Sequence, residues 1–177
     1  MRIGLLSDTH GFLDDQIFAY FADCDEIWHA GDIGSLVVSE QLSAFKPFEA
    51  VYGNIDGADI RARYPEDLWL EREGIRVWIT HIGGYPPRYN PRVRQVLAER
   101  QPDLMVCGHS HILKVVRDPK RHPMLCLNPG AAGRHGFHQI RTLLRFTIKN
   151  GQVGDMEVIE LGKRSLPGRW QKRGDDR

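Results

Sequence analysis

Short apolar runs alternate with segments of helical periodicity through the first part of the chain. Compact apolar runs predict buried strands at 2–7, 26–30, 48–52 and 104–107. Apolar residues at helical spacing predict helices over 12–21, 36–45 and 91–100. This alternation is typical of an α/β fold with a mainly parallel sheet and right-handed crossovers. Ligands of such sheets gather beyond the carboxyl ends of the strands.

The remaining sequence has the pattern of consecutive strands. A hairpin is expected from 68–71 and 75–80, with its turn over 72–74. Further strands are expected at 113–117, 124–127, 143–148 and 153–160. Asn150 and Gly151 are the clearest signal for a hairpin turn. The chain is therefore expected to begin as α/β and to end rich in β-strands.

Length and charge indicate one domain with a basic end. A length of 177 residues with 41% hydrophobic composition favours a single domain, expected over 1–161. The segment 162–177 holds six Lys or Arg residues against two Asp residues and is expected to be a flexible C-terminal tail. An arm that reaches toward phosphate-rich substrate or nucleic acid is the alternative. The formal net charge of the whole chain is +1, so charge alone predicts neither a nucleic-acid nor a membrane partner.

Cysteine usage and the length of the apolar stretches bear on the cellular compartment. The three Cys residues are widely spaced and form no Cys-x-x-Cys pair, which disfavours a disulfide framework and a zinc ribbon. Charged residues or Gly interrupt every apolar stretch before the roughly 18 residues that a membrane-spanning helix requires. The protein is therefore expected in the cytoplasm, with neither a signal peptide nor a membrane partner.

Polar residues with metal-binding side chains follow the predicted strands. In chain order they are Asp8-Thr9-His10, Gly31-Asp32, Gly53-Asn54-Ile55-Asp56, His81 and Gly108-His109-Ser110-His111. Each motif alone is ordinary, since an Asp often caps a helix and an Asn often occupies a turn. A parallel sheet brings its strand ends to one edge, and there the combined oxygen and imidazole groups suit two divalent cations that promote attack on a phosphate ester.

In this order the motifs resemble those of the calcineurin-like metallophosphoesterases, specifically the small single-domain phosphodiesterases of bacteria and archaea. The fold of that branch also occurs in the retromer subunit called vacuolar sorting protein twenty-nine. The resemblance covers residues 1–131. It implies a four-layer α/β/β/α sandwich of two mixed β-sheets flanked by helices, which agrees with the α/β start and the β-rich end of the chain.

The resemblance also implies a dinuclear metal centre. Asp8, His10 and His111 would hold one ion, Asn54, His81 and His109 would hold the other, and Asp32 would bridge them. Manganese is the expected metal, with nickel, iron, zinc and magnesium as alternatives. Catalysis is expected to run through a metal-activated hydroxide, with Asp8, Asp32, Asn54 and His81 as the catalytic residues.

Further residues are candidates for contacts with the ligands or with the substrate. Asp56 is expected to accept a hydrogen bond from a ligand imidazole, and His29 is either such a partner or a satisfied strand histidine. Tyr85 and Arg88 lie in a Pro-rich loop that would stack a base or clamp a phosphate. The candidates in the Gly-rich turn after Asn128 are Arg134, His135 and His138.

Two departures from the family pattern bear on the substrate. Ile55 stands where the larger protein phosphatases of the superfamily have a His that protonates the leaving group. This replacement favours phosphodiesters and leaving groups that need little protonation. Ala131 stands where the family has a Ser near the site, so a role for that hydroxyl is lost.

The sequence therefore favours a dinuclear, metal-dependent phosphodiesterase that acts on a small phosphate ester or a nucleotide. One alternative is a non-catalytic or weakly active protein-interaction scaffold on the same fold, although a scaffold has no need of seven ligands. Another is a nucleotide or lipid pyrophosphate hydrolase, which Ile55 and the short chain disfavour. A nucleic-acid substrate and a homo-oligomer stay open.

Overall fold

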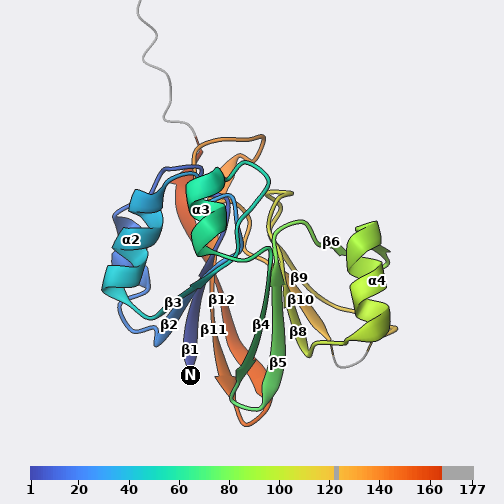
Figure 1. Ribbon diagram of the computed structural model, residues 1–177. Helices are drawn as coiled ribbons and strands as arrows, with labels where there is room; N and C mark the ends of the chain where they lie inside the picture. The colour runs from blue at the N-terminus through green and yellow to red at the C-terminus, as the bar shows by residue number, and fades with distance from the viewer. Residues whose placement is uncertain (122–123, 165–177) are drawn as a thin grey trace, which may run out of the picture.

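Two five-stranded sheets face each other at the centre of the computed structural model, which describes residues 1–121 and 124–164 (Figure 1). The first sheet has the strand order β12 (Gln152–Lys163), β11 (Ile140–Lys149), β1 (Arg2–Leu6), β2 (Glu26–His29) and β3 (Phe48–Ala50). The second has the order β4 (Asp67–Arg72), β5 (Ile75–Thr80), β8 (Leu104–Val106), β10 (Leu125–Asn128) and β9 (Lys114–Arg117). A small separate hairpin consists of β6 (Gly84–Tyr85) and β7 (Arg88–Tyr89).

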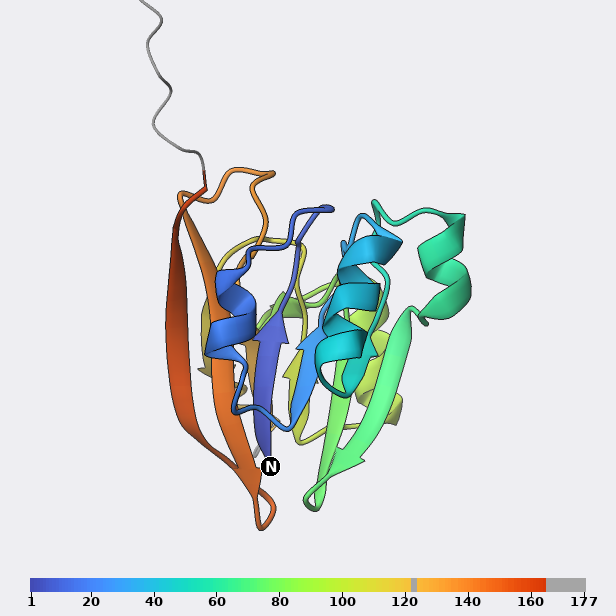
Figure 2. The same ribbon diagram turned by 90° about the vertical axis from the view of Figure 1, so that its left-hand side faces the viewer.

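Helices form the two outer layers of the molecule. The first sheet is covered by α1 (Gln16–Tyr20) and α2 (Leu36–Phe45), and the second by α4 (Pro91–Glu99), as Figures 1 and 2 show. The short helix α3 (Ala58–Arg63) lies beside the upper rim of the first sheet in Figure 1. The prediction of a four-layer sandwich with two mixed sheets is therefore confirmed.

Three buried apolar layers hold these elements together. Leu5 and Val77 belong to the layer between the two sheets, which is fully shielded from water. Leu6 packs with Leu42 of α2 in the layer outside the first sheet, and Leu97 of α4 packs in the layer outside the second. Successive residues of β1 thus serve opposite faces of the sheet, as the period of two along a strand requires.

The parallel strands of both sheets deliver their carboxyl ends to one rim. In the first sheet β1, β2 and β3 are mutually parallel, and in the second β5, β8 and β10 are parallel. The segments that follow β1, β2, β3, β5 and β8 therefore meet between the sheets at the upper edge seen in Figure 1. Every predicted metal-binding motif lies in one of these segments.

The helix predicted over 12–21 is shorter in the structure and begins only at Gln16. The Asp14 carboxylate accepts a hydrogen bond from the Gln16 backbone N–H at 3.0 Å and a second one from Arg141 at 2.7 Å. This buried ion pair fixes the preceding residues in a turn, which competes with helix formation.

Two elements and two strand extensions were not predicted. Helix α3 has one buried side chain, Ile60, and the β6–β7 hairpin has two residues per strand, so neither has a readable hydrophobic period. Strands β11 and β12 extend beyond their predicted ends, where Ile140 pairs with Lys163 and Lys149 pairs with Gln152.

The C-terminal segment is described only in part. Strand β12 runs to Lys163, two residues into the segment predicted as a tail, and residues 165–177 of that segment lie outside the described residues. Within 1–121 and 124–164, no helix has the length and apolar character needed to cross a membrane.

Candidate metal centre

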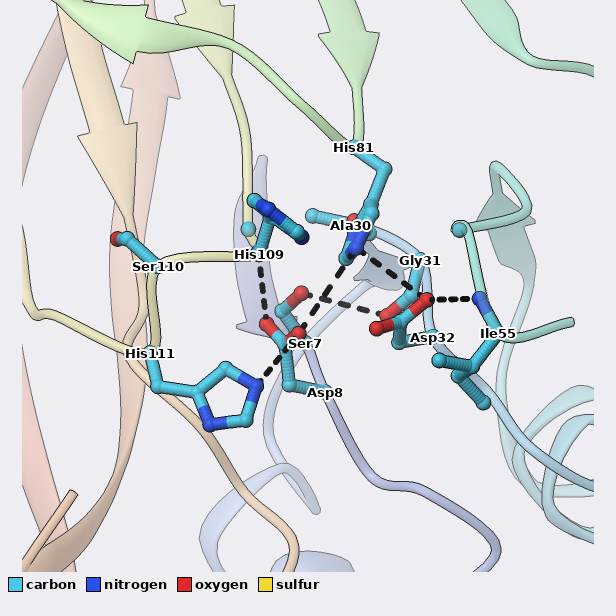
Figure 3. Close-up of polar contacts among 12 residues, drawn as sticks. Ser7, Asp8, Ala30, Gly31, Asp32, Ile55, His81, His109, Ser110 and His111 are labelled. Atoms are coloured by element: carbon cyan, nitrogen blue, oxygen red, sulfur yellow. Dashed lines mark hydrogen bonds and ion pairs between the residues drawn. The ribbon is translucent and has the colours of Figure 1, made fainter. Parts of the chain in front are cut away.

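Two groups of possible metal ligands lie side by side at the rim between the sheets (Figure 3). In each group the ligand atoms are all within 4.8 Å of one another. One group consists of Asp8, His10 and His111, and the other of Asp32, His81 and His109. Asn54 lines the cavity above them together with His10, Asp32, His109 and His111. The structure thus brings together the seven residues that the sequence selected.

Asp32 lies between the two groups. Its Oδ2 is 3.7 Å from His10 Nε2 in one group, and its Oδ1 is 3.3 Å from His81 Nε2 in the other. Oδ1 also accepts a hydrogen bond from the Ile55 backbone N–H at 3.0 Å. Burial favours the protonated carboxyl, but the adjacent His81 imidazole and the Ile55 N–H outweigh it, so the pKa of Asp32 is lowered. The ionised side chain therefore offers one oxygen to each group.

Several of these residues have a left-handed backbone. The φ angles are +55° for Asp8, +47° for His10, +54° for Asp32, +67° for His109 and +58° for His111. A non-Gly residue in this region costs on the order of 1 kcal/mol, so it persists only where its surroundings fix it. Backbone hydrogen bonds supply part of that support, from Asp8 N–H to Gly31 O and from His10 N–H to Asp32 O, both at 3.0 Å. The backbone of these five candidate ligands is thus strained.

Glycine permits the close approach of the segments that carry the ligands. A Cβ atom at Gly53 would lie 2.0 Å from Asp32 Oδ1, and one at Gly108 would lie 2.1 Å from Ser7 Oγ. Both distances are far below van der Waals contact, and the neighbours are buried. Substitution of either glycine would therefore displace a candidate ligand.

The Asp56 carboxylate binds three backbone N–H groups. Oδ1 accepts from Gly34 at 2.7 Å, and Oδ2 accepts from Gly53 at 2.7 Å and from Ile33 at 3.1 Å. This corrects the expectation that Asp56 accepts from an imidazole. The carboxylate instead ties the segment after β2 to the segment after β3, which carry Asp32 and Asn54.

Two buried polar atoms point into the centre without a hydrogen bond. The Ala30 carbonyl lies 2.7 Å from His81 Nδ1, so this nitrogen carries the proton and Nε2 keeps its lone pair. His81 Nε2 and Asp8 Oδ1 are buried, and neither has a hydrogen-bond partner in the described part of the chain. Buried polar groups are rarely left unsatisfied, and a cation bound to each of these atoms would satisfy it. The residues present therefore fit a metal ion.

His29 is a satisfied strand histidine, and within the described residues its hydrogen bonds go to Thr9 and to the Gly31 backbone. The Thr9 hydroxyl donates to Ile33 O at 2.9 Å, so at 2.9 Å it accepts from His29 Nε2. His29 Nδ1 accepts from Gly31 N–H at 3.2 Å. Burial lowers the pKa of this imidazole to about 3, against the opposing charge of Asp8, so the ring is neutral. Of the two interpretations of His29, these contacts fit the satisfied strand histidine and not a hydrogen-bond partner of a metal ligand.

His138 supports His111 from behind. Its Nε2 lies 3.0 Å from Gly133 O and therefore carries the proton, which leaves Nδ1 as an acceptor. His111 Nδ1 lies 3.2 Å from that acceptor and must donate. The Nε2 lone pair of His111 then faces Asp8 Oδ1 at 3.1 Å. His138 thus selects the tautomer of His111 that a metal ligand needs.

The remaining sequence candidates lie in different places. Tyr85 directs its hydroxyl to Ser110 at 2.5 Å, so it supports the segment of His109 and His111. The Arg134 guanidinium lies over the Phe12 ring at 4.2 Å, and Arg88 is exposed on β7 and lines neither cavity beside the centre. Of these four candidates, only His135 lines the cavity above the two groups, and its ring centroid lies 4.9 Å from that of His10.

Two arginines that the sequence did not select lie beside the centre. Arg61 and Arg92 line a second cavity of about 390 Å³, which shares Asn54 and His81 with the centre. Both stand in ordinary helical segments, so no motif distinguishes them from other surface arginines.

Comparisons with known proteins agree with this geometry. Residues 1–151 match the model of the calcineurin-like phosphoesterase superfamily domain. A probable metallophosphoesterase of Methanothermobacter thermautotrophicus is 31% identical over 138 residues, which cover 74% of this chain and 77% of the relative.

Solved structures share the fold. An archaeal phosphodiesterase has a TM-score of 0.69 and 22% identity, with 91% of this chain and 100% of that one covered. Vps29 of Chaetomium thermophilum has a TM-score of 0.70 and 12% identity, with 90% and 94% covered. The family match spans most of the sequence, and the candidate ligands fall inside it. This chain therefore belongs to the calcineurin-like phosphoesterase superfamily.

Proposed function

We propose that this protein is a phosphodiesterase that uses two divalent metal ions. In this proposal Asp8, His10 and His111 hold one ion, Asn54, His81 and His109 hold the other, and Asp32 bridges them. The observation that carries the proposal is the pair of buried, unpartnered atoms, Asp8 Oδ1 and His81 Nε2, in the two adjoining groups. When bound, the ions supply a nucleophile at neutral pH and offset the charge on the phosphoryl oxygens.

The chemistry of the donors favours a hard or borderline metal. Carboxylate, amide and imidazole groups suit manganese, our first choice, and also nickel, iron, zinc and magnesium. Neither group contains a Cys, and burial raises the pKa of the nearby Cys107, directly before Gly108, to about 12. The protein itself orients these donors through the Ala30 carbonyl behind His81 and the His138 ring behind His111.

Ile55 supports a preference for diesters. Its backbone N–H holds Asp32, while its side chain lines the cavity above the centre and is 46% exposed. An alkyl group at this position cannot protonate a departing alkoxide, which a monoester of a poor leaving group requires. The proposed substrates are therefore phosphodiesters, of a small molecule or a nucleotide, whose leaving group needs little protonation or takes its proton from water.

A direct assay tests the proposal. The full chain is stripped of metal and assayed with bis(p-nitrophenyl) phosphate, with and without manganese. We expect metal-dependent release of p-nitrophenol, lost in Asp32→Asn because the bridging charge is removed. Asp15→Asn, an exposed carboxylate at the start of α1, is the matched control and is expected to keep full activity.

The likeness to Vps29 favours one further candidate, a protein-binding scaffold without hydrolytic activity. The same assay separates the two functions. Protein that binds two ions per chain and yet releases no product at any pH or with any of the five metals would refute the enzyme and favour the scaffold.

A further inference from the structure

The second cavity at the rim is continuous with the centre through two residues. Asn54 and His81, both assigned above to the same ion, also line this cavity. Its other walls come from Tyr52, from Arg61 of α3, and from Asn90 and Arg92 at the start of α4. A substituent on a phosphoryl group at the centre therefore has a cavity with polar lining residues beside it.

Arg61 is held rigidly on one side and is open on the other. Its Nε donates to Asp56 O at 2.6 Å, and its Nη2 donates to Gly53 O at 3.3 Å and to Asn54 O at 3.2 Å. The guanidinium also lies over the Tyr52 ring at 4.5 Å. Within 1–121 and 124–164, no hydrogen bond or ion pair occupies Nη1. A fixed cation with free donors is suited to an anion, because little side-chain entropy is lost on binding.

Arg92 shapes the cavity without a free charge. Its Nη1 donates to Asp67 at 2.6 Å, its Nη2 donates to Thr80 Oγ1 at 2.7 Å, and its Nε lies 3.7 Å from Glu66. Two carboxylates thus offset one guanidinium. The Glu66 charge is in turn offset by Arg92 and by the Tyr52 hydroxyl at 3.3 Å. Arg92, Asp67 and Glu66 together carry a net charge of −1, and Arg61 is the cation of this wall that has no ion-pair partner within the described residues.

Asn90 adds a second donor to the lining of the cavity. Its Oδ1 accepts from the Arg92 backbone N–H at 3.0 Å and caps the nine-residue helix α4. The amide Nδ2 has no hydrogen-bond partner in the part of the chain that the structure describes. The amino end of α4 carries a partial positive charge, which favours an anion near Asn90.

We propose that this cavity binds a second phosphate of the substrate, with Arg61 and Asn90 as its donors. The inference rests on the phosphodiesterase function proposed above and names the substrate class: a phosphodiester with a further phosphate on one arm, as in a short oligonucleotide. The reacting phosphate lies at the metal centre, and the additional phosphate lies in the cavity that opens beside His81.

Binding and hydrolysis are measured separately on the full, manganese-loaded chain. For binding, calorimetry compares thymidine 5′-monophosphate with thymidine 3′,5′-bisphosphate. For hydrolysis, the KM of the dinucleotide TpT is compared with those of pTpT and TpTp. We expect the added phosphate to tighten binding, and to lower KM in one of the two phosphorylated dinucleotides, by roughly tenfold or more, the range of a charge-assisted hydrogen bond.

Arg61→Met tests the assignment, because it keeps an unbranched apolar stem and removes the guanidinium and its charge. Arg61 also binds loop carbonyls, so its loss could change the binding of every ligand. Each comparison is therefore the ratio of the affinities, or of the KM values, for two ligands measured on the same variant. The ratio is expected to fall to about one in Arg61→Met. Arg63→Met is the matched control, since Arg63 lies on the same helix and pairs with Glu40 at 3.3 Å outside the cavity. It is expected to keep the wild-type ratio.

The outcomes distinguish the two proposals. Equal binding of the monophosphate and the bisphosphate, or a preference that survives in Arg61→Met, overturns the phosphate site whether or not hydrolysis occurs. A preference that Arg61→Met abolishes, with neither TpT nor its phosphorylated forms hydrolysed, supports the phosphate site and overturns the phosphodiesterase.

Discussion

Replacement of His138 by Phe provides the most direct test of how the centre is supported. The two rings His138 and His111 meet edge to face with centroids 5.1 Å apart, so Phe preserves the shape of the contact. It removes the acceptor for His111 Nδ1–H and the donor to Gly133 O. His111 then loses the bond that keeps the Nε2 lone pair directed toward Asp8.

The expected loss follows from these two hydrogen bonds. Each is worth about 1 kcal/mol, so together they represent about 2 kcal/mol, or about thirtyfold in affinity. That value falls within the 10–100-fold range that is usual for loss of a hydrogen-bond partner behind a metal-bound His, a range of about 1.4–2.8 kcal/mol. The effect should be confined to the ion held by Asp8, His10 and His111, because His81 keeps its Ala30 partner.

Calorimetric titration of metal-free protein with manganese measures both sites at once. We expect two binding events in the wild type and about thirtyfold weaker binding at one of them in His138→Phe, by the reasoning above. His138→Gln, whose amide can both donate and accept, should restore most of the loss. Unchanged affinity at both sites in His138→Phe, or equal weakening of the two sites, would refute the support of His111 by His138.

Three other predictions follow from the centre and its surroundings. In Ile55→His the ratio of monoester to diester hydrolysis should rise by about a hundredfold for poor leaving groups, and an unchanged ratio would contradict the role given to Ile55. Below pH 6.5 the unfolded chain protonates His29 while the folded chain, with a pKa of about 3, does not. Stability should therefore fall by up to about 1.4 kcal/mol per pH unit on acidification. Urea unfolding of His29→Asn between pH 6 and pH 4 should show a shallower fall, and an equal slope would argue against burial of a neutral ring. Addition of manganese at about one hundred times its Kd should stabilise the metal-free protein by about 2.7 kcal/mol for each occupied site and raise Tm by roughly 5–10 °C per site, in scanning calorimetry. The same rise in Asp8→Asn would show that the ion binds elsewhere.

The convergence of the seven candidate ligands was predictable, and the contacts behind them were not. Each motif follows a strand, and the ends of parallel strands meet at one edge, so Asp8, Asp32 and His109 come together by topology alone. The partners of Asp56 depend on how the segments after β2 and β3 lie against each other, which is a long-range property. Sequence periodicity carries no such information.

Two short helices account for further differences between the predicted and the observed secondary structure. Helix α3 has six residues and one buried side chain, so the hydrophobic period does not reveal it, and Arg61 passed as an ordinary surface residue. For α1, the buried pair of Asp14 with Arg141 joins residues 127 positions apart and shortens the helix. In both places tertiary contacts decide the local structure.

Each ligand group takes residues from both halves of the sandwich. Asp8, His10 and Asp32 follow strands of the first sheet, whereas His81, His109 and His111 follow strands of the second. An ion bound in either group would link the two sheets at the rim. The affinity of the site for the ion would therefore depend on the distance between the sheets. A core mutation far from the centre, for example at Val77 in the layer between the sheets, would then act on the metal by changing that spacing. Folding stability and metal affinity are in this way thermodynamically linked, so a change made at one end of the molecule can be measured at the other.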